Sequence, residues 1–357
     1  MGFIKRGRLI YLIVCICFIA NTSLMGENMM GAKIYDYDKP LPPLFKQWKD
    51  LGFNTMLISD VMAAKPEFMK LAKENNIKTF IIAPMFCSPD KPVADSLYAR
   101  NAKNEKALSQ WVHFVCPLRQ SYRRRRLEFV KQLIRKYKPD GISIDFIRYF
   151  AYWEKIPPQT VLDPLDNTCF CDTCLQQMQK DLKFTFPGRL KTRTQKAQWV
   201  FKHKEAQWTA WKCKIITTMV KEVALSARSI DPEILLNAHI VPWRSKDFAA
   251  GIRKRVGQDI IAISAIVDYV SPMCYSHMVK QSPQWVHDVV KDMAAQSSKP
   301  VIPSIQVKKA YLKEPFTLES FKQALKAALK KPSGGILFWN WKALAENNEK
   351  QKIVKVR

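Results

Sequence analysis

Eight short apolar runs alternate with longer segments of helical periodicity along this chain, and this alternation limits the fold more than any other feature. The runs cover residues 32–37, 54–59, 79–85, 141–146, 235–240, 269–274, 301–305 and 335–339, and helical patterns cover 43–51, 66–76, 121–137, 197–230, 246–263, 284–296 and 317–331. Eight strand–helix units over about 330 residues predict one α/β domain, a (β/α)8 TIM barrel. A doubly wound open sheet is the alternative, but it usually has fewer strands, and the sequence lacks a glycine-rich phosphate loop.

Residues 1–26 have the pattern of a secretory signal peptide. Three basic residues precede an apolar run at 9–20, and small and polar residues follow it. We therefore expect residues 27–357 to form the mature barrel, in a secreted or periplasmic location. The alternative is an uncleaved signal anchor, because the apolar segment is nearly long enough to span a membrane. Membrane contact is expected only in that anchored form.

The chain carries 58 Lys and Arg against 31 Asp and Glu, a formal net charge of +27. Such an excess raises the question of nucleic acid binding. The basic residues are spread along predicted helices, chiefly 121–137 and 317–331, with no nucleic-acid-binding motif beside them. A hydrophobic fraction of 47% excludes a disordered polyelectrolyte, since such a chain can bury a large core. We therefore expect solvated helix faces and no nucleic acid partner.

The most specific motif lies in a long insertion after the fourth predicted strand, residues 149–197. The insertion contains Cys169, Cys171 and Cys174, and Cys116 precedes a predicted helix. Three thiols within six residues cannot all pair with one another as disulfides, but four thiolates can close a tetrahedral zinc site. Such a site has no position for water, so its expected role is structural. The alternative is one disulfide with free thiols, which an oxidising compartment would favour.

The order of these features resembles two groups of known barrel enzymes. Cys116-Pro117, a helix opening with Tyr122-Arg123, a strand and then Cys-x-Cys-x-x-Cys resemble the zinc-cluster arrangement of family 42 β-galactosidases. The stretch 140–149, Asp-Gly-Ile-Ser-Ile-Asp-Phe-Ile-Arg-Tyr, is similar to the strand-four motif of the glycoside-hydrolase-like families 6 and 10. The resemblance implies a (β/α)8 fold, a structural zinc ion and a hydrolase of oligo- or polysaccharides.

The tip of the fourth strand supplies the first candidate catalytic group. Because side chains alternate along a strand, Ser143 and Asp145 are expected to point into the barrel, and Ile142, Ile144 and Phe146 toward the helices. Asp145 would then end at the C-terminal face, where barrel enzymes keep their catalytic groups. We expect it to act as nucleophile or general base. The alternative is a structural carboxylate satisfied by a nearby arginine.

Glycoside hydrolysis normally needs a second carboxyl group. Family 42 enzymes carry a glutamate at the end of strand seven, where this chain has Gln306, which can act neither as acid nor as nucleophile. Glu154 in the insertion and Asp60 after the second strand remain as candidate catalytic partners of Asp145. Without a second carboxyl group in the cleft, the chain would be a non-catalytic carbohydrate-binding or cell-surface protein.

Polar and aromatic side chains near the same strand tips are candidate substrate-binding groups. Flat rings suit stacking on sugar faces, although they also suit core filling, and a buried histidine is a common structural residue. Arg148 could orient Asp145 or hold an acidic group of the substrate, which leaves an anionic glycan open. The candidates are Arg148, Tyr149, Asp36, His239, Trp243, Tyr275, His277, Gln306 and Trp339.

Overall fold

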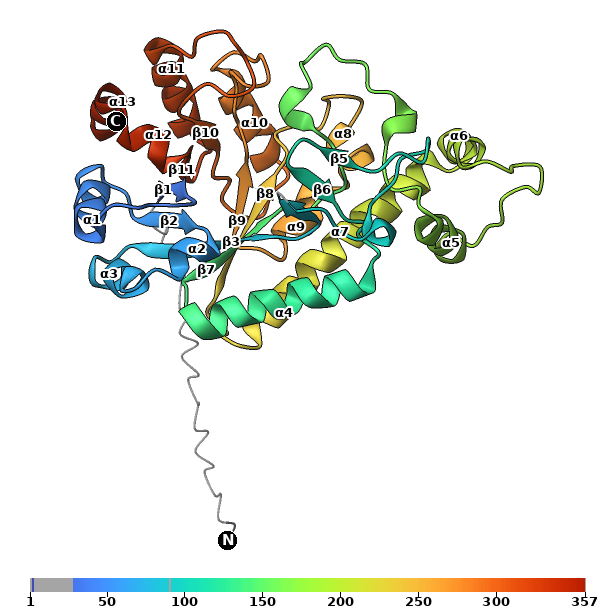
Figure 1. The fold of residues 1–357 in the computed structure, drawn as a ribbon, viewed down its shortest axis with the longest axis horizontal. Helices are drawn as coiled ribbons and strands as arrows, with labels where there is room; N and C mark the ends of the chain where they lie inside the picture. Colours follow the sequence, from blue (N-terminus) through green and yellow to red (C-terminus); the bar gives the residue numbers. More distant parts are fainter. Residues whose placement is uncertain (1, 3–27, 90, 357) are drawn as a thin grey trace.

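The computed structural model describes residues 2, 28–89 and 91–356, so the predicted leader at 1–26 lies outside the described part of the chain, apart from Gly2. Eight parallel strands follow one another around a barrel in sequence order (Figure 1). They are β1 (Met29–Ile34), β2 (Thr55–Ile58), β3 (Lys78–Pro84), β7 (Gly141–Asp145), β8 (Leu235–Ile240), β9 (Tyr269–Pro272), β10 (Ser304–Gln306) and β11 (Gly335–Trp339). Parallel bridges from Val270 to Val301 and from Met273 to Ser304 join β9 to β10 and close the ring. The predicted TIM barrel is confirmed.

Helices surround the barrel; two of the predicted helices are divided, and α2, α5, α12 and α13 were not predicted. The predicted helix 197–230 is two helices, α6 and α7, which meet at Lys204, where a φ of −140° interrupts the helical path. The predicted helix 246–263 is reduced to two short helices, α8 and α9. The helices are α1 (Leu41–Asp50), α2 (Asp60–Ala63), α3 (Phe68–Glu74), α4 (Gln120–Tyr137), α5 (Asp172–Asp181), α6 (Arg193–His203), α7 (Glu205–Arg228), α8 (Gly251–Lys254), α9 (Ile260–Ser264), α10 (Trp285–Ala294), α11 (Leu318–Leu329), α12 (Trp341–Ala345) and α13 (Asn348–Lys355).

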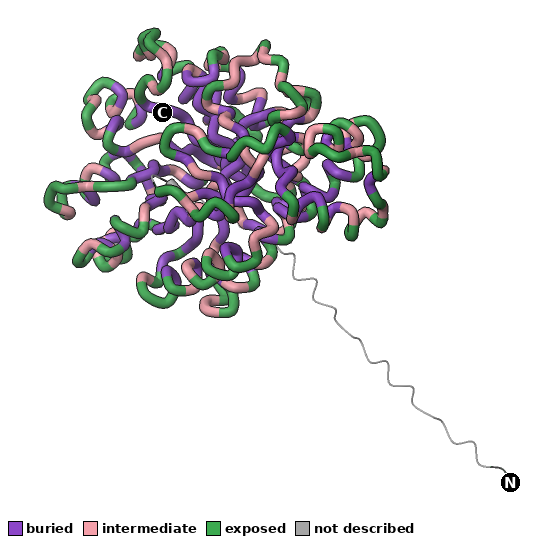
Figure 2. The backbone as a smooth tube through the Cα atoms, turned by 45° about the vertical axis from the view of Figure 1, so that its right-hand side comes forward, coloured by how far each residue is buried: buried purple, intermediate pink, exposed green. Residues whose placement is uncertain are grey.

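Burial is concentrated between the strands and the helices and inside the barrel (Figure 2). Ile142 and Ile144 of β7 are fully buried in the larger apolar cluster, as the alternation predicted. A second, smaller apolar cluster lies inside the barrel and includes Leu57, Phe80 and Leu337. Ser143, Asn237 and His239 are also buried inside the barrel, where hydrogen bonds join them in a polar layer.

Two connections at the carboxyl ends of the strands are much longer than the others. The β3–α4 connection carries a small antiparallel sheet of β4 (Cys87–Pro89), β6 (Val112–Phe114) and β5 (Leu108–Ser109), together with a 3-10 turn, η1 (Asp95–Leu97). The β7–α7 connection is the predicted insertion, and it contains η2 (Trp153–Lys155), η3 (Pro164–Asp166), α5 and α6. Among the described helices, none combines the length and the apolar character that a membrane span requires.

Candidate active site and cysteine cluster

A cavity of about 570 Å³ opens at the carboxyl ends of the barrel strands. It brings together all three predicted catalytic candidates, Asp145, Glu154 and Asp60. Asp145 ends β7, Glu154 lies in η2 of the insertion, and the exposed Asp60 begins α2 at the rim. The cavity lining also includes Lys33, Tyr35, Trp111, Phe146, Arg148, Trp153, Tyr275, Tyr311 and Trp339.

Asp145 lies where the strand pattern placed it, but the residue after it does not. The Oδ1 atom of Asp145 accepts the backbone N–H of Phe146 at 2.7 Å. Phe146 has a φ of 49°, so the backbone leaves the strand geometry there and the Phe146 side chain lines the cavity. The prediction that Phe146 points toward the helices is therefore wrong, because strand alternation stops at Asp145. Ser143 points inward as predicted, with its Oγ 2.9 Å from Nε2 of His239.

Glu154 has the environment expected of a catalytic acid. Its Oε2 atom is buried and has no hydrogen-bond partner among the described residues. Burial penalises the charged carboxylate and raises the pKa of Glu154 to about 7, against the opposing effect of the Arg148 cation and with a smaller contribution from the Asp145 charge. A carboxyl group of this kind is protonated in much of the population near neutral pH and can donate that proton.

Arg148 is buried and holds the backbone of the loop that leads to Glu154. Its Nη1 donates to the carbonyl oxygens of Ala151 at 2.8 Å and Tyr149 at 3.3 Å. The guanidinium lies over the ring of Phe114, 4.7 Å from its centroid. No ion pair within 4.0 Å joins Arg148 to an acidic side chain in the described part of the chain. The geometry therefore supports a positioning role for Arg148 more directly than a pairing with Asp145.

Lys33 on β1 is a cavity residue that the sequence reasoning missed. Its side chain is 1% exposed, and its Nζ donates to the hydroxyl of Tyr275 at 3.3 Å and lies 3.5 Å from Nδ1 of His239. Burial lowers the pKa of Lys33 to about 8, against the favourable charge of Asp145. The first strand was expected at 32–37 but spans Met29–Ile34, so Lys33 lies near the carboxyl end of the strand and not near its start. The available signal was a single lysine inside an otherwise apolar strand.

Aromatic rings form the wall and the roof of the cavity. Tyr275 and Trp339 stack with ring centroids 4.6 Å apart, and Trp153 lies 5.8 Å from Tyr275. Trp111 comes from the β3–α4 connection and Tyr311 from the β10–α11 connection, and Nε1 of Trp111 donates to the Tyr311 hydroxyl at 3.4 Å. Strands β3 and β10 are four positions apart in the ring of eight, so this contact crosses the barrel mouth.

Two of the predicted substrate-binding residues belong to the polar layer inside the barrel. His239 is buried, and burial together with the neighbouring Lys33 cation lowers the pKa of its imidazole to about 3, so the ring is neutral. Gln306 accepts the backbone N–H of Met278 at 2.9 Å and donates to the carbonyl oxygen of Lys308 at 3.0 Å. Both side chains are committed to internal hydrogen bonds, and neither lines the cavity.

Four other predicted residues lie outside the cavity lining. Tyr149 is buried beneath the Lys212 ammonium, and Trp243 is buried against Phe248 with ring centroids 4.8 Å apart. Asp36 is exposed in the loop after β1, and the His277 ring packs at a tilt against Phe316, with ring centroids 5.2 Å apart. Of the nine predicted substrate-binding residues, the cavity is lined by three: Arg148, Tyr275 and Trp339.

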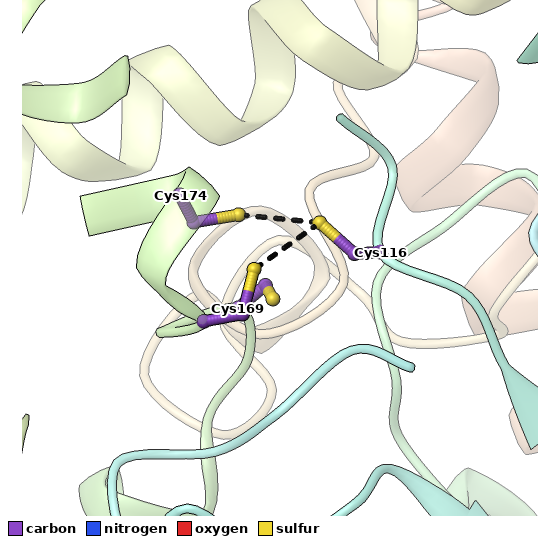
Figure 3. Close-up of side chains that lie close together, drawn as sticks. Cys116, Cys169 and Cys174 are labelled. Atoms are coloured by element: carbon purple, nitrogen blue, oxygen red, sulfur yellow. Dashed lines mark hydrogen bonds between the residues drawn. The ribbon is translucent and has the colours of Figure 1, made fainter. Parts of the chain in front are cut away.

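The four predicted cysteine ligands converge in one buried cluster, and Figure 3 shows Cys116, Cys169 and Cys174 pointing toward one another. The four Sγ atoms lie within 4.8 Å of one another, with Cys116 3.4 Å from Cys174 and 3.6 Å from Cys171. All described cysteines are free thiols, and these separations are far longer than a disulfide bond. Zinc–sulfur bonds of about 2.3 Å in a tetrahedron place sulfurs about 3.8 Å apart. The cluster can therefore hold a metal ion with few adjustments.

No family model and no curated protein matches this sequence. Solved structures do match it. The glycoside hydrolase domain of PgaB (BpsB) from Bordetella bronchiseptica aligns with a TM-score of 0.68 at 12% identity, covering 92% of this chain and 98% of that one. β-Galactosidases from Marinomonas ef1 (TM-score 0.65, 10% identity, 92% and 58% coverage) and Rahnella sp. R3 (0.61, 13%, 94% and 56%) also align.

The chain spans somewhat more than half of each β-galactosidase chain and nearly all of the PgaB domain. At these identities the likeness establishes a shared barrel fold. The resemblance to glycoside hydrolases that the motifs indicated is confirmed in the fold and in the presence of the cysteine cluster.

Proposed function

We propose that this chain is a glycoside hydrolase acting on an oligo- or polysaccharide. One observation carries the proposal: two carboxyl groups, Asp145 and Glu154, line one cavity in unequal environments. The buried Glu154 has a pKa of about 7, whereas Asp145 accepts a backbone N–H and lies among the Lys33 and Arg148 cations. Unequal environments are how barrel enzymes separate an acid from a base or nucleophile.

In this mechanism Glu154 donates its proton to the glycosidic oxygen as the bond from that oxygen to the anomeric carbon breaks. Asp145 either attacks the anomeric carbon or removes a proton from an attacking water molecule. In the first case water later hydrolyses the glycosyl–Asp145 ester, and Glu154 regains its proton from that water. The Tyr275–Trp339 stack provides a flat wall for the sugar ring.

A purely carbohydrate-binding role would be favoured by the loss of the second carboxyl group. Glu154 occupies the cavity with an unpartnered carboxyl oxygen, which supports catalysis over binding alone. Gln306 no longer argues for a degenerate enzyme, since its amide is engaged by backbone groups around Met278 and Lys308. Asp60 remains a rim residue and is assigned no catalytic step.

We further propose that the cysteine cluster binds one structural zinc ion. Four thiolates leave no coordination position for water, so the ion would supply no catalytic chemistry. It would join Cys116, at the end of the β3–α4 connection, to the insertion that carries Cys169, Cys171 and Cys174. The backbone N–H of Arg100 donates to Cys169 Sγ at 3.5 Å, as expected around a thiolate ligand.

The leader pattern supports export, either with cleavage after the first 26 residues or as a signal anchor. The substrate would then be an extracellular or periplasmic glycan. Residues 27–357 are proposed to act as one barrel domain, with 149–197 as its zinc-pinned insertion.

A screen of neutral and anionic polysaccharides for release of reducing ends tests the proposed activity. We expect one class to be hydrolysed, and Asp145→Asn to lower kcat at least about a thousandfold with little change in Tm. Asp50→Asn, an exposed carboxylate at the end of α1, is the matched control and should keep full activity. Turnover retained in Asp145→Asn would reject the assignment.

A further inference from the structure

Lys33 is a buried cation whose hydrogen bonding is incomplete. Its ammonium has two neighbours, the Tyr275 hydroxyl at 3.3 Å and Nδ1 of His239 at 3.5 Å, and both are long contacts to neutral groups. Among the described residues, no carboxylate oxygen lies within 4.0 Å of Nζ. A buried charge without a close counterion is unfavourable, so a ligand that supplies one gains affinity.

The charges around the cavity floor add to this requirement. Lys33 and Arg148 are buried cations, and the half-buried Asp145 is the one anion below the rim among the described lining residues when Glu154 is protonated for its role as acid. Asp60 is exposed at the rim, where water screens its charge. The buried part of the cavity therefore carries an excess positive charge in the state that starts the reaction.

The Arg148 guanidinium is partly engaged within the protein. Its Nη1 donates to the carbonyl oxygens of Tyr149 and Ala151, and one face of the guanidinium lies over the Phe114 ring. Lys33 also lines the cavity, but its three N–H groups meet only two acceptors, both at long distance. The donor available to an anionic ligand is thus at the floor of the cavity, on β1.

We propose that the cavity selects a uronic acid residue, whose carboxylate pairs with the Lys33 ammonium while its ring lies along the Tyr275–Trp339 wall. The inference rests on the proposed function in that the ligand is a sugar bound in the catalytic cleft. The wall gives the flat apolar contact that a pyranose ring needs, and the Lys33 ammonium at the floor gives a cation for one carboxylate. A neutral sugar would leave the Lys33 charge uncompensated.

Binding to the Glu154→Gln variant tests this proposal without turnover. The ligands are tetrasaccharides of polygalacturonate, alginate and hyaluronan, each compared by calorimetry with its carboxyl-reduced counterpart. We expect at least one uronate to bind about tenfold or more tightly than its reduced form. Lys33→Met should remove that difference and Lys33→Arg should keep part of it, with Tm measured for each variant to establish folding.

Lys155→Met is the matched control, since Lys155 is an exposed cation over the Tyr152 and Tyr311 rings at the cavity rim. It should leave the uronate preference unchanged. Equal binding of both forms, a preference that survives Lys33→Met, or no binding of any uronate overturns the inference. Hydrolysis of a neutral glycan without uronate preference would overturn the uronate inference but support the proposed hydrolase activity. Lys33-dependent uronate binding with no hydrolysis by the unmodified chain would support the uronate preference and contradict the proposed hydrolase activity.

Discussion

Lys33 and Lys212 are both almost completely buried, but their hydrogen-bonding surroundings differ. Lys212 of α7 donates to Asn167 Oδ1 at 2.8 Å and to the carbonyl oxygens of Arg255 at 2.9 Å and Lys254 at 3.1 Å. Lys33 has only two longer contacts, to neutral side chains. A structural anchor satisfies its polar groups internally, whereas a ligand site leaves them available.

The same contrast separates the two regions that these lysines contact, the insertion and the cavity. Two sets of interactions hold the insertion. Lys212 donates to three oxygen acceptors, including Asn167 of the insertion, and four thiols converge on the other side. The cavity retains an unpartnered Glu154 oxygen and an under-coordinated Lys33. Substitutions in the cavity should therefore reduce activity and spare stability, and substitutions in the insertion anchors should do the opposite.

The largest effect on activity within this comparison is expected for Glu154→Gln. Loss of the proton donor should lower kcat by about 10²–10⁴-fold for substrates with poor leaving groups. Kinetics with a natural glycan and with an aryl glycoside measure this directly. A much smaller loss on the aryl glycoside, which needs little acid assistance, is part of the expectation. Equal losses on both would argue that Glu154 acts otherwise.

Glu154→Gln should also change stability in a pH-dependent way. The pKa of Glu154 is about 7 in the folded protein and about 4.5 without the fold, so the folded state binds more protons between those values. The free energy of unfolding contributed by Glu154 therefore falls as the pH rises from about 4.5 to about 7 and stays low above it. The variant should have the higher Tm at pH 8 and lose that advantage at pH 4.5, in thermal melts. A lower Tm at pH 8 would show that the carboxylate is stabilised by its site.

Lys212→Met and Lys33→Met form the direct test of the comparison. Lys212→Met removes the donor from two buried acceptors and one partly buried acceptor, at roughly 1–3 kcal/mol for each buried one, so the free energy of unfolding should fall by about 3 kcal/mol or more. Lys33→Met removes a desolvated cation with weak contacts and should change stability by less than about 1 kcal/mol. Denaturant titrations measure both, with the exposed Lys49→Met as control. Similar losses for the two buried lysines would break the distinction.

Cys171→Ser should lower the metal content of the protein more than it lowers the catalytic rate. We expect about one zinc per chain in the purified protein by elemental analysis, reduced in the variant, with a lower Tm and a smaller loss of activity than in Glu154→Gln. Cys213→Ser, which alters a buried thiol outside the cluster, is the control and should retain the metal. A metal-free protein with disulfides in this region would refute the zinc proposal.

The smallest expected effect is at the roof of the cavity. Trp111→Ala removes the contact with Tyr311 across the barrel mouth and should raise KM about two- to tenfold with little change in kcat. Steady-state kinetics on long and short oligosaccharides measure the change. A large loss of kcat would instead show that the bridge positions the catalytic groups.

The sequence was sufficient for the barrel and for the cysteine cluster. Strands β8 and β11 begin and end where the apolar runs do, because these runs are bounded by clear polar or glycine-containing turns. The cysteine ligands followed from spacing alone. Asp145 at the tip of β7 followed from alternation, and the carboxyl partner was narrowed to Glu154 and Asp60.

The other features of the candidate site depend on tertiary geometry, which local sequence patterns do not determine. The first strand ends three residues before its predicted end, which brings Lys33 close to the strand tip, and the left-handed backbone at Phe146 places that ring in the cavity lining. Gln306 resembled a lost catalytic group until its backbone partners were known. The burial of Glu154 depends on a loop folded over the barrel, which alternation cannot predict.

The pH dependence of kcat on the susceptible glycan tests the central claim most directly. If Glu154 is the general acid, its protonated form is active, so kcat should fall as the pH rises through about 7. That descending limb should be absent in Glu154→Gln, whose residual rate should not depend on pH near 7. A limb near pH 7 that persists unchanged in Glu154→Gln would contradict the account and move the catalytic acid elsewhere.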